Sequence, residues 1–129
     1  MTARRVAAGA TVALVALAAC AAPRNAIGTR SSACFRALPT AMTAVHHHGH
    51  LVGVRKVSRA TLLHAVPQPN PPDGRDFCVV GFSGPYRSQD VERPSGPAAG
   101  RYAMVAVTTR GTDALRTYLV DHLPLRLRH

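Results

Sequence analysis

Residues 101–109 read RYAMVAVTT, and this stretch decides the predicted fold because it has the clearest strand pattern in the chain. Successive side chains of a strand point to opposite faces of a sheet. One face would carry Tyr102, Met104, Ala106 and Thr108, and the other Ala103, Val105 and Val107. Apolar residues on both faces are typical of a strand inside a sheet. We therefore expect 101–109 to be a central strand.

Two more strands are predicted earlier in the chain. Residues 51–57 (LVGVRKV) form the first, and a short helical turn over 58–64 follows, with Ser58 placed to cap it. Residues 77–83 form the second strand and would place Cys78, Val80 and Phe82 on one face.

Two loops separate these strands in the prediction. Residues 66–76 hold four prolines, which lack the N–H that helices and central strands require. Residues 94–100 are rich in proline and glycine and predict a second polar loop.

Two main helices complete the predicted domain. The first follows Cys34, ends before Gly49, and carries an apolar stripe at helical spacing: Phe35, Leu38, Met42 and Val45. The second covers 112–123, ends at Pro124, and has its own stripe: Leu115, Leu119, Val120 and Leu123. The expected fold class for 33–129 is therefore α+β, a small antiparallel three-stranded sheet with two main helices packed on it.

The N-terminal residues have the layout of an export signal. Arg4 and Arg5 precede an apolar segment over 6–17, and small residues follow it. The uncharged run over 6–22 is seventeen residues long, shorter than the roughly 20 that cross a bilayer. We expect 1–19 to be a signal peptide; an uncleaved membrane anchor is the alternative.

The stretch Leu17-Ala18-Ala19-Cys20 resembles a lipobox, the processing signal of bacterial lipoproteins. The resemblance implies that Cys20 carries a diacylglyceryl group and becomes the first residue of the mature chain. Two acyl chains hold a protein stably on a bilayer, whereas one does so only marginally. Residues 20–32 would then form a lipidated, flexible tether, and the domain would lie on the extracytoplasmic face of the cell membrane. An ordinary signal peptide cut at a nearby Ala-x-Ala is the alternative.

The remaining two cysteines support the same location. If Cys20 is lipidated, Cys34 and Cys78 are left as one possible pair. Outside the cytoplasm such a pair can oxidise to a disulfide. A disulfide that closes a loop of this length would stabilise the folded state by about 4 kcal/mol. Two buried free thiols are the alternative.

Composition agrees with an exported protein. Fifteen arginines stand beside one lysine, and the mature chain keeps fourteen basic and six acidic residues, a formal charge of +8. This bias resembles small uncharacterised exported proteins of high-GC Gram-positive bacteria. The positive charge could hold the domain near anionic lipid head groups. No basic cluster interleaved with aromatic residues is present, which argues against nucleic acid as a partner.

Residues 46–50 read HHHGH and raise the possibility of a zinc or copper site at His46, His47, His48 and His50. Three consecutive side chains fan out around a helix, so at most two of them could readily meet one ion. Further ligands, such as His64, His122 or a carboxylate, would be needed. The alternative is a solvated helix end whose histidines complement the negative end of the helix dipole.

Nothing in the sequence pairs a nucleophile with a base. GFSGP, residues 81–85, resembles the nucleophile elbow G-x-S-x-G but has Pro85 in place of its second glycine. The six carboxylates show no acid and base arrangement. We therefore predict a protein that is not an enzyme and needs no cofactor, with a hydrolase as a remote alternative.

The tail LPLRLRH, residues 123–129, alternates apolar and basic residues. Its leucines could pack on the domain, or Arg126 and Arg128 could contact lipid head groups. Together these features predict a membrane-anchored lipoprotein that binds a protein or another component of the cell envelope. The alternative function is a lipoprotein that binds zinc or copper through the histidine cluster.

Overall fold

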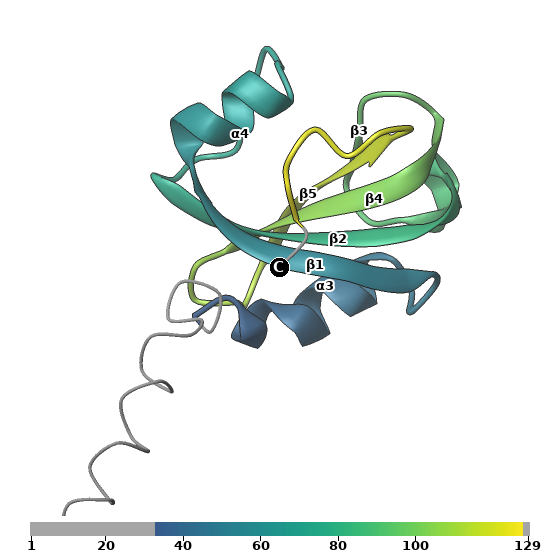
Figure 1. The fold of residues 1–129 in the computed structure, drawn as a ribbon, viewed down its shortest axis with the longest axis horizontal. Helices are drawn as coiled ribbons and strands as arrows, with labels where there is room; N and C mark the ends of the chain where they lie inside the picture. Colours follow the sequence, from purple (N-terminus) through teal and green to yellow (C-terminus); the bar gives the residue numbers. More distant parts are fainter. Residues whose placement is uncertain (1–32, 128–129) are drawn as a thin grey trace, which may run out of the picture.

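The computed structural model describes residues 33–127, and its main feature is a five-stranded mixed sheet (Figure 1). The strand order is β1-β2-β4-β5-β3. Neighbouring strands are antiparallel, except that β3 runs parallel to β5. The strands are β1 (His50–Ser58), β2 (Asp76–Arg87), β3 (Pro94–Ser95), β4 (Ala99–Thr108) and β5 (Ala114–Val120).

The central strand predicted over 101–109 is confirmed as β4. It lies between β2 and β5, and five consecutive residues, 103–107, are buried. Val105 pairs with Val80 on β2 and with Thr117 on β5. The alternation expected from the sequence therefore supplies apolar side chains to both faces of the sheet.

The helix predicted over 112–123 is wrong, because this segment forms strand β5. A tight turn after β4 sends the chain straight back along that strand: Gly111 N–H donates to Thr108 O over 2.8 Å, and Gly111 has a positive φ of 78°. Thr108 N–H then donates to Asp113 O over 3.0 Å. Pairing with β4 outweighs the helical spacing of the leucines.

The predicted three-stranded sheet with two main helices is therefore wrong as well. The described residues hold two short α-helices, α3 (Leu38–Ala44) and α4 (Arg59–Ala65), and two 3-10 turns, η2 (Phe35–Ala37) and η3 (Ser88–Asp90). Most of the fold is strand. None of the helices in 33–127 has the length and apolar content needed to cross a bilayer.

The first helix forms where the sequence predicted it, but only part of the expected stripe faces the core. Val45 is buried and Leu38 packs against the core, whereas Phe35 and Met42 are 54% and 39% exposed. The rest of the buried face consists of small residues: Cys34, Ala37, Ala41 and Ala44. Small side chains let this segment lie close to the sheet and to the β4–β5 turn, where a Cβ on Gly111 would come within 2.9 Å of the Arg36 backbone.

The strands predicted over 51–57 and 77–83 are confirmed as β1 and β2, whereas the loop predicted over 94–100 is shorter than expected, because 94–95 form β3 and β4 begins at Ala99. The predicted helical turn and proline loop are also present. Ser58 caps α4, with its side chain accepting from Thr61 N–H over 3.2 Å. The proline loop between α4 and β2 has no regular structure and is held by side chains on both sides. Arg59 donates to Pro72 O over 2.5 Å, and Arg116 and Tyr118 donate to Gln68 Oε1 over 3.1 and 3.0 Å.

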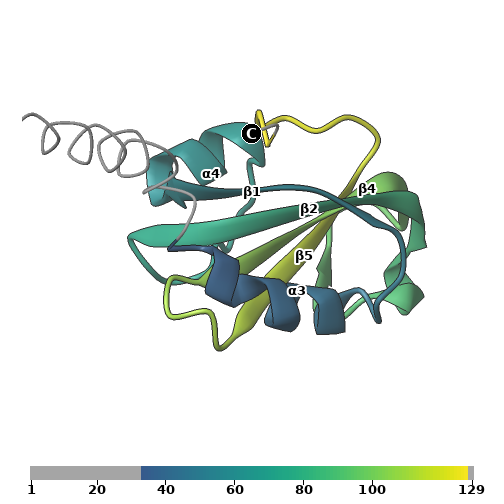
Figure 2. The same cartoon turned by 60° about the horizontal axis from the view of Figure 1, so that its bottom comes forward.

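The sheet separates two apolar layers, which Figure 2 shows from the side. The segment η2–α3 covers one face, called here the α3 face. Helix α4 and the C-terminal tail, residues 121–127, cover the other, called here the tail face. The α3 face carries Cys78, Val80, Phe82, Ala103, Val105, Val107 and Leu119. The tail face carries Val57, Phe77, Val79, Met104, Ala106 and Tyr118.

The predicted disulfide between Cys34 and Cys78 is present. Its Cα atoms lie 5.4 Å apart, and the two cysteines are 44 residues apart in sequence. The bond joins the residue before η2 to the middle of the sheet, so it fixes the start of the α3 layer against β2.

Candidate functional site

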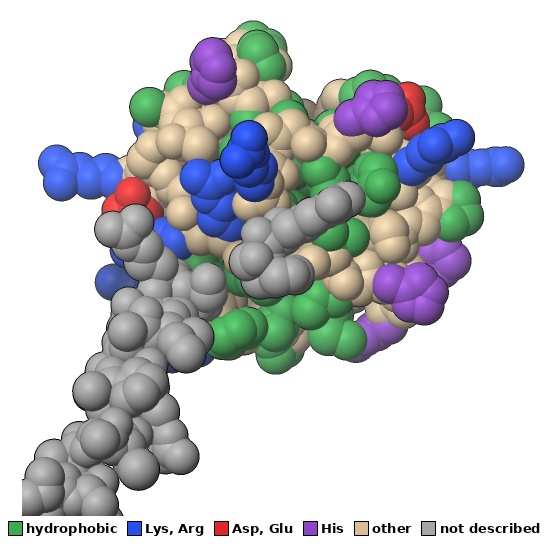
Figure 3. All heavy atoms as spheres, in the orientation of Figure 1, with side chains coloured by type: hydrophobic (Ala, Val, Ile, Leu, Met, Phe, Trp, Pro, Cys, Tyr) green, Lys and Arg blue, Asp and Glu red, His purple; other side chains and the backbone are tan. Residues whose placement is uncertain are grey.

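The most exposed large apolar side chains lie on one side of the molecule. Phe35 and Met42 come from η2 and α3, and Leu51, which is 52% exposed, comes from the start of β1. Figure 3 shows hydrophobic side chains gathered along the lower edge of the molecule, where α3 and β1 lie in Figure 1. Such an exposed grouping is a feature that marks interaction sites.

A small cavity of about 110 Å³ lies between α3 and β1. Its apolar wall is made by Leu38, Met42 and Val45 on one side and by Leu51 and Phe82 on the other. His47, His48 and Gly49 complete the lining. We call this cavity, together with the exposed Met42 and Leu51 beside it, the α3–β1 groove.

The HHHGH stretch forms the turn that closes one end of this groove. Helix α3 ends in a Schellman motif, in which His47 N–H donates to Met42 O over 2.8 Å and His46 N–H donates to Thr43 O over 3.0 Å. His46 and His47 have positive φ values of 53° and 58°. This left-handed backbone costs a non-glycine residue roughly 1–2 kcal/mol, so the turn requires support from its neighbours.

Tyr86 supplies that support from β2. Its buried hydroxyl donates to His48 O over 2.5 Å, and the His48 ring lies edge-on to the tyrosine ring with centroids 5.5 Å apart. A Cβ on Gly49 would lie 2.0 Å from the tyrosine Oη, so only glycine fits there. Burial raises the pKa of Tyr86 to about 12.

The four predicted metal ligands do not meet at one point. His47 and His48 line the α3–β1 groove, whereas His46 and His48 also line an open cleft with Gln89 and Asp90. Across 33–127, no group of three or more His, Cys, Asp or Glu side chains is arranged to hold a metal ion. Metal binding by the histidines therefore stays a prediction.

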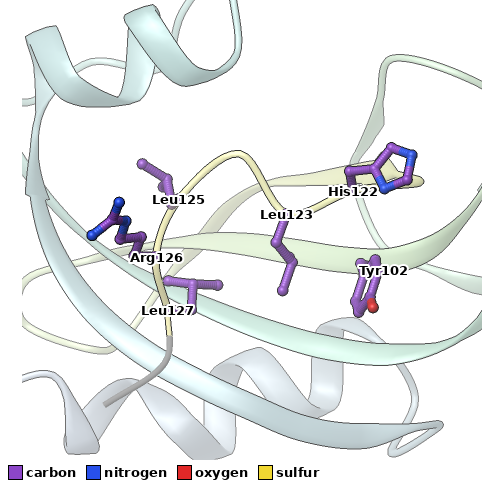
Figure 4. Close-up of a pocket in the computed structure, with 6 residues that line it drawn as sticks. All are labelled: Tyr102, His122, Leu123, Leu125, Arg126 and Leu127. Carbon is purple, nitrogen blue, oxygen red and sulfur yellow. The ribbon is translucent and has the colours of Figure 1, made fainter.

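A second cleft, of about 510 Å³, lies under the C-terminal tail. Figure 4 shows Tyr102 and His122 at one end of it and Arg126 and Leu127 at the other. Leu125 and Leu127 are only 6% and 2% exposed. Of the two roles considered for the tail, packing of its leucines on the domain is confirmed, while Arg126 is exposed.

The tail leucines fit a notch made by two paired glycines. Gly53 on β1 and Gly81 on β2 lie opposite each other in the sheet. A Cβ on Gly53 would lie 1.8 Å from Leu127 O, and one on Gly81 would lie 2.4 Å from Leu127 Cδ1. The tail can therefore lie directly on the sheet only because both positions lack a side chain.

The GFSGP segment does not form a nucleophile elbow. Such an elbow needs a strand that turns into a helix at the serine. Ser83 instead lies inside β2, which continues to Arg87.

Comparison with protein families, with curated proteins and with solved structures found no match to this chain. We therefore infer function from the residues themselves. The predicted signal peptide (1–19), the lipidated Cys20 and the tether (20–32) lie outside the described residues. The sequence located the histidine turn, but it missed the groove beside it, because Phe35 and Met42 were assigned to the core.

Proposed function

We propose that this protein is a lipid-anchored binding module of the cell envelope, without enzymatic activity, that holds an apolar side chain of another envelope protein in the α3–β1 groove. The observation that carries the proposal is the convergence of exposed Met42 and Leu51 on an apolar cavity. Scattered exposed hydrophobic residues are normal on a monomer, but a grouping around a cavity is the usual form of a docking site.

The elements around the groove make it rigid. The disulfide fixes the start of η2, and Thr40 Oγ1 donates to Gly111 O over 2.6 Å in the middle of α3. Glu92 N–H donates to Ala44 O over 2.8 Å at the end of that helix. A pre-formed site loses little conformational entropy on binding, which favours affinity.

The anchor would keep this site close to the membrane. Twelve residues, 21–32, separate Cys20 from the described structure, and a fully extended chain of that length spans at most about 40 Å. A partner in the same membrane or in the adjacent wall is therefore within reach. The positive charge of the mature chain adds attraction to anionic head groups.

Two measurements test the proposal. Mass spectrometry of the native protein should find a diacylated N-terminal Cys20, and Cys20→Ser should release the chain from the membrane fraction. In intact cells, a photo-crosslinking residue at Leu51 should give one discrete adduct that Met42→Ser abolishes. The same probe at Leu63, on α4, is the matched control. Equal adducts from both positions, or none from Leu51, would refute docking in the groove.

A second candidate function is zinc or copper binding, because His46 and His48 line one open cleft with Asp90. Two imidazoles and a carboxylate are suitable ligands for either metal. These three side chains are not arranged to hold an ion within 33–127, so they would have to come together on binding. Titration of the full chain with Zn²⁺ or Cu²⁺ should then give micromolar affinity that His46→Ala weakens and His64→Ala does not. Affinity in the millimolar range, or equal effects of both substitutions, would exclude it.

A further inference from the structure

We propose that the partner of the α3–β1 groove binds as an added β-strand along the free edge of β1, and that it is an acidic peptide with one aliphatic side chain in the cavity. This inference rests on the proposed function, since it specifies how an envelope protein would occupy the groove. Three properties of the described residues carry it: an unpaired edge, the size of the cavity and the charge of the surrounding segment.

Within residues 33–127, no strand pairs with the outer edge of β1. It is the first strand in the sheet order, and eight of its nine residues pair with β2, with an irregularity at Val52. Every second residue of an edge strand presents its N–H and C=O away from the sheet, where they can pair with another chain. The opposite edge is formed by the two residues of β3 and by the parts of the seven-residue β5 that β3 does not cover. An added strand would therefore have a long template on the groove side.

The cavity is the right size for one side chain. It measures about 110 Å³, and a cavity of roughly 150 Å³ is enough to hold benzene. An aliphatic side chain such as leucine or valine therefore fits it better than an aromatic one. In peptide recognition by strand addition, backbone hydrogen bonds supply affinity and a side-chain pocket supplies specificity. The pocket at the start of β1 matches this arrangement.

The charge of β1 favours one class of partner. Residues 33–58, which form η2, α3 and β1, contain Arg36, Arg55, Lys56 and four histidines but no carboxylate. Asp90 lies beside His46 and His48 at the histidine turn, so the positive part of the edge is the later part of β1, where Arg55 and Lys56 are exposed. Like charges facing each other across paired strands are unfavourable. An acidic peptide is therefore favoured over a basic or neutral one.

The same charges argue against two other occupants. Pairing of β1 with β1 of a second copy would place the exposed Arg55 and Lys56 of both copies on the same pair of strands. The chain's own residues 20–32 carry Arg24 and Arg30 and no acidic residue. Both arrangements add positive charge to a positive edge, whereas an acidic partner neutralises it.

The experiment uses synthetic peptides and the full chain held in phosphatidylcholine vesicles. The probe is a fluorescein-labelled peptide of nine residues that alternates Glu and Val and has one central Leu, with binding followed by fluorescence anisotropy. Two further versions are N-methylated on the odd or on the even residues. Because an added strand uses the N–H groups of alternate residues, one methylated version should bind about tenfold more weakly and the other should retain most of its affinity.

Two protein variants and one further peptide complete the test. Leu51→Ser should weaken the parent peptide about fivefold, because it removes part of the cavity wall. Leu63→Ser, on α4, should not. A peptide with Lys in place of Glu should bind more weakly than the parent at low salt, and the difference should shrink as salt is added.

The outcomes separate this inference from the proposed function. Equal binding by the parent and both methylated peptides overturns strand addition, and equal binding by the lysine peptide overturns the acidic preference. No binding by any peptide overturns the inference as a whole, and crosslinking at Leu51 would then decide the proposed function independently. Binding of the chain to phosphatidylglycerol vesicles that is lost in Leu51→Ser would assign the groove to lipid and overturn the peptide.

Discussion

The two faces of the sheet are covered in different ways. On the α3 face, a disulfide, a side-chain hydrogen bond from Thr40 and a backbone hydrogen bond to Ala44 hold the covering helix. On the tail face, residues 121–127 have one backbone–backbone hydrogen bond within the described structure, from Leu127 N–H to Leu125 O, and it is local. Leucine burial in a glycine notch holds the tail.

This difference bears on where a binding site can lie. Directional and covalent links fix the α3 layer in one position, so a groove beside it keeps its shape. Burial of apolar surface has no directional requirement, so the tail is positioned by fit alone. Substitutions on the two faces test this contrast, and the expected change in the free energy of unfolding decreases from the disulfide to Thr117.

The largest effect is expected from removal of the covalent link on the α3 face. Replacing both Cys34 and Cys78 with alanine should lower the free energy of unfolding by about 4 kcal/mol, because the 44-residue separation gives a large loop-closure entropy. Urea denaturation measures the loss. Wild-type protein kept in reductant should unfold at the same urea concentration as the double variant. A loss below about 1 kcal/mol would mean that the remaining contacts fix α3 without the disulfide.

The next effect concerns the glycine notch on the tail face. Gly53→Ala places a Cβ 1.8 Å from Leu127 O, so the tail must leave the sheet. Exposure of the tail leucines should lower the free energy of unfolding by about 3 kcal/mol, which is the contribution expected from burying one or two leucine side chains. Gly84→Ala is the matched control in β2, since its Cβ would meet only ordinary contacts of 3.4 Å and more.

Truncation of the chain after His122 provides a second check on the notch. If Gly53→Ala acts by expelling the tail, the truncated chain should lose little further stability from the substitution, because coupled changes are not additive. Additive losses would show that Gly53 is needed by β1 itself and that the tail is not the cause.

Much of this fold could be predicted from local signals in the sequence. The alternating pattern of β4 and the prolines of 66–76 each determine the nearby backbone through side-chain burial or a missing N–H. Ser58 likewise caps α4 through a contact with a residue three positions away. These features depend on neighbours along the chain, so a single sequence contains them.

Strand β5 could not be predicted in the same way. The leucines at 115, 119 and 123 fit a helix, and the outcome depends on pairing with β4 across a turn at Gly111. The short β3 depends on a parallel contact of Pro94 with Thr117, which no local pattern reveals. Pairing between distant residues therefore decided the part of the fold that the sequence analysis got wrong.

The groove could have been found from one signal in the sequence. Cys34, Ala37, Ala41 and Ala44 recur at helical spacing just as Phe35, Leu38, Met42 and Val45 do. The predicted bond to Cys78 already placed Cys34 toward the sheet. Ala37, Ala41 and Ala44 lie on the same helical face as Cys34. Phe35 and Met42 therefore had to lie on another face. Combining the disulfide with the helical period would have predicted the exposed apolar surface.

A smaller effect is expected where β2 supports the histidine turn. Tyr86→Phe removes the hydrogen bond to His48 O and should lower the free energy of unfolding by about 1 kcal/mol at neutral pH. The pKa of Tyr86 is raised above 10, to about 12, so folding favours the neutral phenol. The stability that this provides is complete below pH 10 and is lost as pH rises toward 12.

Urea denaturation at pH 8, 10 and 11 measures this pH dependence. The wild type should lose more stability over the range than the variant does. The variant should keep part of the dependence, because burial also raises the pKa of Tyr118. Identical slopes in both proteins would mean that the Tyr86 hydroxyl reaches solvent in the native state.

The smallest effect should be a gain in stability, on β5. Thr117 is fully buried, and its Oγ1 has no hydrogen-bond partner among residues 33–127. It lies two positions from Leu119, so its side chain belongs to the α3 face. A buried hydroxyl without a partner costs roughly 1–3 kcal/mol, and valine keeps the branched shape without that cost. Thr117→Val should raise the free energy of unfolding by about 1 kcal/mol.

Thr108→Val on β4 is the matched control for this prediction, because it makes the same chemical change at a threonine that has a hydrogen bond. Thr108 Oγ1 accepts from Asp113 N–H over 3.4 Å, so the same chemical change there removes a hydrogen bond at the β4–β5 turn. We expect opposite signs: a higher urea midpoint for Thr117→Val and a lower one for Thr108→Val. If Thr117→Val were destabilising too, its hydroxyl would have a partner. In that case polar contacts would hold even the apolar centre of the α3 face, and its contrast with the tail face would be greater still.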